Sequence, residues 1–358
     1  MISRKAVSLI AAGLFATSPL AAQEATPPAV PPVQLRDGSR DFDFERGTWA
    51  LHISRLVHPL TGSTQWTDYD GTKTDIPIWG GKANLAEVNA EGRAGRLQFL
   101  ALRLYNPAAH QWGLYFASAN SGVFGTPLVG VFRNGHAEFV GPDVYNGRSI
   151  LVRFVMQSDG PGKASSEQYF SADGGHSWEL NWINTYTRTN TPSSASAQSP
   201  NAATNHDFDF ALGTFHTQIR RLQNPLTGST TWVGYQGTKT DVPIFGGKGS
   251  LETIEADGPS HLELMTLRLY NPAGRQWSLN FSSSESGEMA TPAIGEFRHG
   301  IGTFTDQEDY NGRTILVRQL WSNITASSYH FEQAFSADHG KTWEPNFVAD
   351  LTRRPPSL

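Results

Sequence analysis

The chain has 358 residues, no cysteine and a formal net charge of −5. The lack of cysteine excludes disulfide scaffolds, thiolate metal sites and cysteine nucleophiles, and the acidic balance argues against nucleic acid as a partner, because backbone binding needs a concentrated positive face. Hydrophobic residues make up 38% of the chain and charged residues 17%, with 35 glycines, a composition typical of an all-β globular protein.

The first 22 residues have the pattern of a secretory signal peptide. Arg4 and Lys5 precede an apolar run over 6–17 that is too short to cross a bilayer, and small residues follow it. We therefore predict cleavage after Ala22, a flexible lead-in rich in Pro and Ala over 23–40, and a periplasmic or secreted protein. No other stretch is apolar enough to span a membrane.

An internal repeat indicates that one domain is written twice. The repeated motifs are DFDF at 41–44 and 207–210, GTKTD at 71–75 and 237–241, LRLYNPA at 102–108 and 267–273, and YNGR at 145–148 and 310–313. The repeat predicts two domains, over 41–188 and 207–354. The segment 189–206 between them is rich in Ser, Ala, Asn and Pro and is typical of a flexible linker. Two independent units are the default expectation, and docking of the two domains against each other is the alternative.

Within each copy, apolar and polar residues alternate and turn signals recur at short intervals, which predicts strands and no helix. In the first copy, strands are expected near 49–54, 64–70, 76–90 (one or two), 97–105, 112–116, 128–133, 136–140, 150–157, 165–171 and 177–188. About ten antiparallel strands remove their exposed edges most simply by closing on themselves. The predicted fold class is therefore all-β, with two tandem antiparallel β-barrels. Both faces of 97–105 and 150–157 are apolar, so alternation alone does not say which side chains point inward.

A Gly-x-aromatic motif opens the first strand of each copy, and an arginine closes the last. The residues are Gly47, Trp49 and Arg188 in the first copy and Gly213, Phe215 and Arg353 in the second. This pairing resembles the lipocalin and wider calycin signature, and the whole repeat is similar to a bacterial calycin-like family without an assigned activity. The resemblance implies a barrel floor closed by the stacked arginine and a ligand cavity, and no reaction.

A second pair of motifs follows the pattern S-x-D-x-G-x-x-W. It contains Asp173 and Trp178 in the first copy and Asp338 and Trp343 in the second. The pattern resembles the Asp box, in which the carboxylate accepts hydrogen bonds from its own turn and Gly supplies a positive φ. We predict a structural role for these residues.

Histidine chemistry is not supported by the repeat. None of the 11 histidines is matched by a histidine in the other copy, so a site present in both domains cannot use one; a histidine site in a single domain is the alternative, and HExxH, GxSxG and P-loop patterns are absent. We therefore predict no catalytic residue, no metal and no cofactor. Several charged residues are shared instead; those at Lys73/Lys239 and Asp75/Asp241 fall in turn-like segments, where we expect solvated or structural roles.

Other shared charges fall among the apolar residues of strands. If they point inward, each barrel would enclose about two unpaired positive charges, and burying these is costly without an anionic guest. The predicted ligand-binding residues are Arg55, Arg103, Tyr105, Arg153 and Glu167, with their counterparts Arg221, Arg268, Tyr270, Arg318 and Glu332. In the alternative arrangement these arginines face outward and form cross-strand ion pairs.

The leading functional hypothesis is a non-catalytic protein that binds a small apolar or anionic amphipathic molecule inside its barrels. One alternative is an isomerase-like or cyclase-like barrel enzyme in which Glu167 works with Tyr105 or Tyr115. Another is a glycan-binding module that uses exposed aromatic rings, for which Trp66/Trp232 and Trp79/Phe245 are the candidates. The sequence indicates no oligomeric state.

Overall fold

The computed structural model of the chain describes residues 36–119, 121–189 and 205–355. The first ten strands are β1 (Gly47–Leu56), β2 (Trp66–Ile78), β3 (Ala83–Gly92), β4 (Gly95–Asn106), β5 (Gln111–Ser118), β6 (Leu128–Arg133), β7 (His136–Tyr145), β8 (Arg148–Ser158), β9 (Lys163–Ser171) and β10 (Glu179–Arg188). The next ten are β11 (Gly213–Leu222), β12 (Trp232–Ile244), β13 (Gly249–Asp257), β14 (His261–Asn271), β15 (Gln276–Ser283), β16 (Ala293–Arg298), β17 (Ile301–Tyr310), β18 (Arg313–Ser322), β19 (Ser328–Ser336) and β20 (Glu344–Arg353). The helices are short 3-10 turns: η1 (Asp43–Glu45), η2 (Trp79–Gly81), η3 (Asp209–Ala211) and η4 (Phe245–Gly247).

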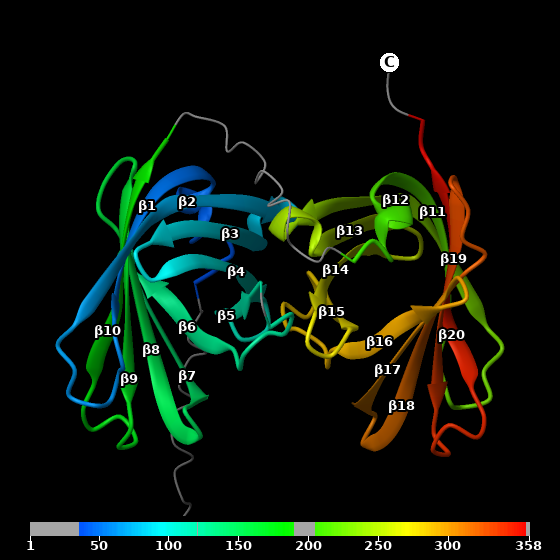
Figure 1. Cartoon of the computed structure of the whole chain (residues 1–358). Coiled ribbons are helices and arrows are strands. Elements are labelled where there is room, and N and C mark those ends of the chain that lie inside the picture. Colours follow the sequence, from blue (N-terminus) through cyan, green and yellow to red (C-terminus); the bar gives the residue numbers. More distant parts are fainter. Residues whose placement is uncertain (1–35, 120, 190–204, 356–358) are drawn as a thin grey trace, which may run out of the picture. The chain divides into compact units, whose positions relative to one another are not determined.

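Each set of ten strands closes into a barrel in which neighbours in sequence pair antiparallel (Figure 1). β1 pairs with both β2 and β10, and β11 pairs with both β12 and β20. Closure leaves no strand edge unpaired. The predicted fold class, two tandem antiparallel β-barrels, is confirmed. The predicted signal peptide, nearly all of the lead-in and most of the linker lie outside the described residues.

The DFDF motif supplies an aromatic plug for each barrel. Phe42, from the first motif, is buried against Trp112 and Phe132, with ring centroids 4.8 Å from each. Phe208, from the second, is buried against Trp277 and Phe297 at 5.1 and 4.9 Å. These edge-on contacts anchor the chain before the first strand of each barrel.

The GTKTD motif lies within a strand, which corrects the expectation of a turn. β2 runs without interruption from Trp66 to Ile78, and β12 from Trp232 to Ile244. Gly71 permits this, because its backbone faces Ala90 so closely that an added Cβ would lie 2.0 Å from the carbonyl oxygen of Asn89. The Lys and Asp of the motif therefore lie on a strand face.

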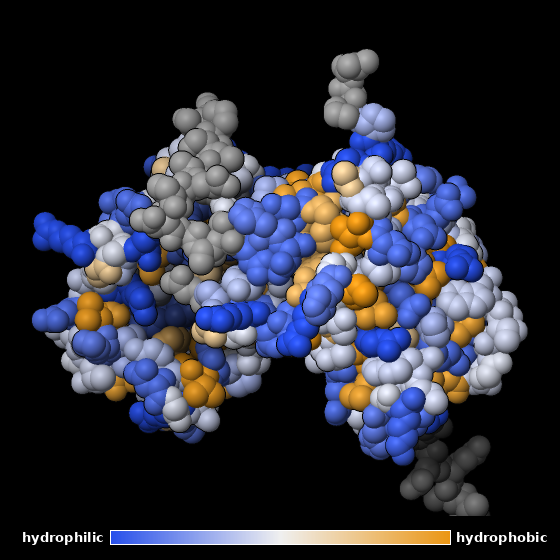
Figure 2. Space-filling view, turned by 45° about the vertical axis from the view of Figure 1, so that its right-hand side comes forward, coloured by the Kyte–Doolittle hydropathy of each residue, from blue (hydrophilic) through white to orange (hydrophobic). Residues whose placement is uncertain are grey.

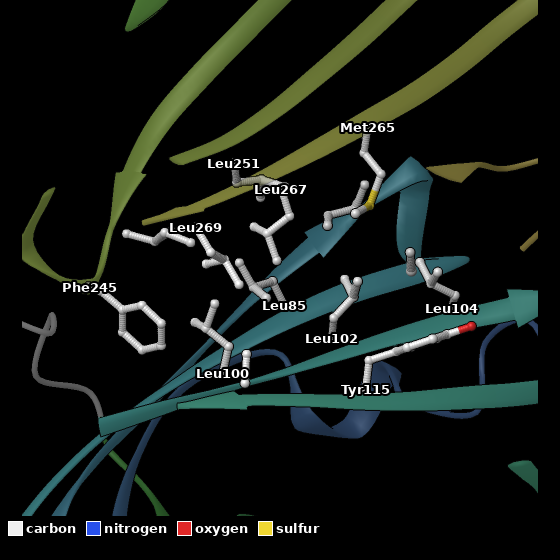
Figure 3. Packing of buried hydrophobic residues seen from close by; sticks show 14 of the residues in the cluster. Leu85, Leu100, Leu102, Leu104, Tyr115, Phe245, Leu251, Met265, Leu267 and Leu269 are labelled. Carbon is white, nitrogen blue, oxygen red and sulfur yellow. The ribbon is translucent and has the colours of Figure 1, made fainter. Parts of the chain in front are cut away.

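One buried apolar cluster draws side chains from both barrels. Leu100, Leu102 and Leu104 of β4 pack in the same cluster as Leu267 and Leu269 of β14 (Figure 3). β4 and β14 therefore carry apolar residues on both faces, because one face lines a barrel interior and the other enters this cluster. Residues Arg36–Leu358 form one compact unit.

The face shown in Figure 2 mixes hydrophilic and hydrophobic residues without one continuous apolar band. Exposed large apolar side chains are scattered, as at Val144 and Ile301, which is ordinary for a folded protein. Within the described ranges, no helix is long and apolar enough to cross a membrane.

Candidate functional site

The arginine at the end of each barrel stacks on the aromatic ring that opens it. Arg188 lies opposite Trp49 in the strand register, with its guanidinium carbon 4.2 Å from the ring centroid. Arg353 lies 4.5 Å from the ring of Phe215 and donates to the carbonyl oxygens of Leu212 and Phe210 at 2.6 and 2.7 Å. Each arginine thus ties the last strand to the turn before the first strand.

The first barrel contains a buried cluster of two cations and two anions. Lys73 Nζ lies 2.6 Å from Glu45 Oε1, and Arg103 NH1 lies 2.6 Å from Glu45 Oε2. Arg103 also donates to Asp75 Oδ2 at 2.7 Å and to Asn84 Oδ1 at 2.8 Å. The cluster is formally neutral, and partnering of this kind is what makes burial of charged groups tolerable.

The fields within this cluster shift its pKa values in different directions. Burial raises the pKa of Glu45, but Arg103 and Lys73 outweigh that effect and hold it below its usual value. Burial raises the pKa of Asp75 and lowers that of Lys73. Burial also opposes the charge of Arg103, yet its two carboxylate partners raise its pKa. Arg103 therefore stays protonated, and both carboxylates of the cluster pair with it.

The second barrel builds the same cluster with its carboxylate on a different element. Lys239 Nζ lies 3.1 Å from Asp241 Oδ2, and Arg268 pairs with both Asp241 and Glu252. Glu252 comes from β13, whereas Glu45 comes from η1. By the repeat offset, Ala211 stands at the position of Glu45 and Ala86 at that of Glu252. Each barrel thus has one glutamate and one alanine at these two positions. The glutamate is on the 3-10 turn in the first barrel and on the strand in the second.

This pairing corrects the expected excess of unpaired charge. Arg103 and Arg268 point inward as predicted, but buried carboxylates neutralise them. Lys73 and Lys239, expected in solvated or structural turns, are fully buried on β2 and β12. They point inward because they share the pleat face of the buried Asp75 and Asp241 two residues on.

A cavity of about 440 Å³ lies in the first barrel above this cluster. Its apolar lining includes Phe99, Phe116, Phe154 and Trp182, and its charged lining residues are all basic: Arg55, Lys73, Arg96 and Arg103. The volume is within the range of small-molecule sites, which are mostly apolar with a few placed polar groups.

Arg55 is the one of these four cations that has no carboxylate partner among the described residues. Arg96 Nε lies 3.9 Å from Glu91 Oε1, and the other two belong to the buried cluster. The guanidinium of Arg55 instead lies 5.5 Å from the ring centroid of Trp182. It points inward, as predicted, because it follows Trp49 and Ile53 on one face of β1. The cavity therefore has one uncommitted positive group.

Arg153, Glu167, Arg318 and Glu332 face away from the barrel interiors, which is the alternative arrangement given for these residues above. Arg153 packs over Tyr169 and Trp178 at 4.5 and 5.2 Å, and the hydroxyl of Tyr169 donates to Glu167. The reason is the strand phase: the apolar side chains that fill the interior from β8 are Ile150, Val152, Phe154 and Met156. The outward, cross-strand arrangement is the one observed.

The second copy repeats this outer arrangement. Arg318 lies over Trp343 at 4.6 Å, and its NH2 lies 3.6 Å from Glu332 Oε1. Neither residue lines the cavity of the second barrel.

The remaining predicted ligand-binding residues also lie outside the cavities. Arg221 is exposed on β11, whereas its counterpart Arg55 lines a cavity. The hydroxyl of Tyr105 accepts from the backbone N–H of Gly38 at 3.0 Å, and Tyr270 packs on Trp277 at 5.3 Å. Both tyrosines therefore contact residues at the ends of the barrels and not ligand-sized cavities.

The second barrel has its own cavity, of about 290 Å³. Its walls include Phe281, Trp321, Tyr329, Phe331 and Phe347, and its charged lining residues are all acidic: Glu252, Glu288 and Glu308. The two barrels therefore share a fold, but the charged residues that line their cavities are basic in the first and acidic in the second.

The Asp boxes staple the β9–β10 and β19–β20 hairpins. Asp338 accepts from the backbone N–H and the hydroxyl of Thr342 at 2.9 and 2.6 Å and from Ser336 at 2.8 Å. These hydrogen bonds lower the pKa of Asp338 to about 2. Asp173 is held in the same way by Ser177 and Ser171, and its pKa is also lowered. The geometry is that of the predicted structural role.

The structure does not bring together the residues of the two alternative functions. Tyr115 lies in the cluster shared by the barrels, and its hydroxyl accepts from the backbone N–H of Met289 at 3.3 Å, whereas Glu167 bonds Tyr169 on an outer face. Trp79 and Phe245, candidates for sugar stacking, are buried in the shared cluster. The other candidate pair, Trp66 and Trp232, is exposed, with Arg220 5.6 Å from the ring of Trp232. Within the described ranges, no three or more His, Asp or Glu side chains form a group that could hold a metal ion.

Sequence reasoning missed Glu45, Glu252, Asp306 and Glu308, because it compared residues shared by both copies and these differ between them. The sequence does contain one signal, because Glu and Ala are exchanged between the copies at positions 45/211 and 86/252. That exchange indicates a shared carboxylate site only once the structure shows that both positions lie beside the same lysine and arginine.

No family model matches the chain, and no curated protein matches it. Among solved structures, a protein of unknown function of the DUF3598 family from Nostoc punctiforme is 11% identical, with 89% of this chain and 100% of that chain covered and a TM-score of 0.28. A mutant of transferrin binding protein B from Haemophilus parasuis is 8% identical, with 86% and 76% covered and a TM-score of 0.19. A putative AttH from Nitrosomonas europaea is 11% identical, with 91% and 99% covered and a TM-score of 0.16. At these scores the similarities assign neither family nor function, and the calycin resemblance is not confirmed.

Proposed function

We propose that this protein is an exported, non-catalytic binding protein that holds a small amphipathic molecule with an acidic head group inside its first barrel. The observation that supports the proposal is the cavity in which every charged lining residue is basic and in which Arg55 has no carboxylate partner within the described part of the chain. A carboxylate at that point would pair with the guanidinium, and the aromatic walls would bury the apolar part of the ligand.

The sequence of the first 22 residues supports the export part of the proposal. We expect the mature protein, recovered from cells that express the full chain, to begin at Gln23 and to occur outside the cytoplasm. N-terminal sequencing of fractionated cells measures both; an intact Met1 in the cytoplasmic fraction would contradict export and leave the binding proposal unaffected.

Titration calorimetry with decanoate tests the binding part. A hydrogen bond to a charged group contributes about 1.5–3 kcal/mol, so Arg55→Gln should weaken decanoate binding about 10- to 100-fold. Arg221→Gln is the matched control, because Arg221 stands at the same repeat position but is exposed outside the cavity. Decanol, which lacks the charge, should bind the wild-type protein and Arg55→Gln about equally.

Two results would contradict the proposal. One is an absence of decanoate binding by the wild-type chain, together with native mass spectra of the purified protein that show no retained small molecule. The other is equal loss of affinity in Arg55→Gln and Arg221→Gln, which would place the ligand outside this cavity.

A further inference from the structure

The cavity of the second barrel differs from that of the first at its polar positions. By the repeat offset, Glu252, Asp306, Glu308 and Gln319 stand where the first barrel has Ala86, Gly141, Asp143 and Phe154. Glu252, Asp306 and Gln319 thus have no polar counterpart in the first barrel. Glu308 does have a carboxyl counterpart, Asp143, but that side chain is exposed. These substitutions lie on the inner faces of the strands, so they change which ligands the second barrel could bind.

The cations of the second barrel are not available to these added carboxylates. Lys239 and Arg268 are fully buried, and they pair with Asp241 and Glu252 in the neutral cluster. Asp306 and Glu308 follow the buried Phe304 at two-residue steps along β17, so they lie on the inner face. Within the described ranges, neither carboxyl has an ion pair, and Asp306 Oδ1 is buried without a hydrogen-bond partner.

Two polar groups that line this cavity have no hydrogen-bond partner among the described residues. Gln319 is 3% exposed and its Oε1 accepts no hydrogen bond from the described residues, and Tyr329 is 4% exposed with its hydroxyl equally unpartnered. Buried polar groups are normally satisfied, so orphaned acceptors that line a cavity indicate a missing donor. A ligand with N–H or O–H groups would supply that donor.

The electrostatics and the walls favour a positively charged donor. Burial, and next the charge of Glu308, raise the pKa of Asp306 to about 7, and burial raises that of Glu308. A cation beside them would relieve the cost of ionising both. Trp321 and Phe331 lie 4.7 Å apart between ring centroids, and Phe347 lies 5.8 Å from Phe331. Such a ring surface attracts organic cations and covers apolar chains.

We propose that the second barrel binds an organic ammonium ion, a primary or secondary amine that carries an apolar group, with its N–H donors directed at Glu308 and Gln319, which line the cavity. Asp306, two residues before Glu308 on the same face of β17, adds to the negative field there. The protein would then hold ligands of opposite charge in its two barrels. This site is separate from the one proposed above, and neither proposal depends on the other.

Titration calorimetry of the full chain at pH 8 with decylammonium tests the assignment. We expect one binding event that Glu308→Gln weakens about tenfold or more, and that Asp306→Asn weakens in the same direction. Asp143→Asn is the matched control, since Asp143 is the exposed counterpart of Glu308. Arg55→Gln, which alters the first cavity alone, should leave this affinity unchanged.

Two probes separate charge from hydrogen bonding. Decyltrimethylammonium has the charge but no N–H, so we expect it to bind about tenfold more weakly than decylammonium, and decanol to bind more weakly still. Equal affinity for decanol and decylammonium, or equal effects of Glu308→Gln and Asp143→Asn, would overturn the proposal. Circular dichroism and the thermal midpoint establish that each variant is folded. Each substitution removes a costly buried charge, so we expect both variants to fold. Loss of the fold in both Glu308→Gln and Asp306→Asn would also overturn the proposal.

Discussion

The buried ion clusters show how one barrel accommodates the same charges in two ways. In the first barrel the second carboxylate is Glu45 of η1, and Ala86 stands at the β3 position; in the second it is Glu252 of β13, and Ala211 stands at the η3 position. The requirement is a second carboxylate beside the lysine and arginine, and not a carboxylate on a particular element. Loss of that group would leave a buried positive charge without compensation.

We expect Glu45→Gln to destabilise the protein by about 3–5 kcal/mol, the usual cost of removing one partner of a buried ion pair. The double variant Glu45→Ala with Ala86→Glu, which copies the second barrel, should recover part of this loss. Urea denaturation measures both. Glu91→Gln is the control, because the Glu91 side chain is 78% exposed; a loss in Glu45→Gln no larger than in Glu91→Gln would show that the cluster does not stabilise the fold.

The strand β17 shows how the pleat decides which charges a barrel encloses. Phe304, Asp306 and Glu308 lie on its inner face, and the residues between them face outward. On β8 the same alternation turns Arg153 outward, where it stacks on Tyr169 and Trp178. A shift of one residue in either strand would exchange these sets.

Asp306 should make stability depend on pH in a defined direction. Its carboxyl keeps a proton up to about pH 7 in the folded protein but has an ordinary pKa of 3.8. The folded state therefore binds more protons than the unfolded state between those values, and the free energy of unfolding falls as pH rises through this window. Asp306→Asn should reduce the loss of stability between pH 5 and pH 8.

The measurement is the urea midpoint of wild-type protein and variant at both pH values. Asp143→Asn should retain the pH dependence of the wild-type protein. If the midpoints of Asp306→Asn and the wild-type protein change in parallel, the carboxyl of Asp306 is not protonated in the folded state at pH 5.

At the scale of the whole described unit, the cluster shared by both barrels links them through apolar contact. Leu102 and Leu267 are both fully buried there, on the faces of β4 and β14 that point away from the cavities. Burial of this kind is the main favourable contribution to folding. The two barrels should therefore unfold as coupled units.

We expect Leu102→Ala to cost about 2–5 kcal/mol, because the substitution leaves a cavity in the packed cluster. Calorimetry should show the two barrels melting further apart than in the wild-type protein. Val144→Ala is the control, since Val144 is 64% exposed. Equal effects of the two substitutions would mean that the cluster contributes little to the coupling.

Much of the fold was predictable because its signals are local or repeated. The repeat indicated two domains of one fold, alternation from Trp49 to Arg55 placed those side chains inward, and the Gly-x-aromatic and Asp-box motifs located strand ends. The inward phase of β8 was not predictable, because Ile150, Val152 and Phe154 alternate with Leu151, Arg153 and Val155, and either set could fill a core. For the same reason the sequence left open whether Arg153 and Glu167 point inward or outward.

The sequence by itself determined the all-β class, the duplication and the positions of most strands, since these depend on neighbouring residues or on comparison of the two copies. Only the tertiary structure decided that Lys73 and Arg103 meet Glu45, and that Glu308 lines a cavity whose charged lining residues are all acidic. Side chains far apart in the chain become neighbours when the strands close, and their charges combine only there. The net charge of −5 therefore does not indicate that basic residues line the first cavity and acidic residues line the second.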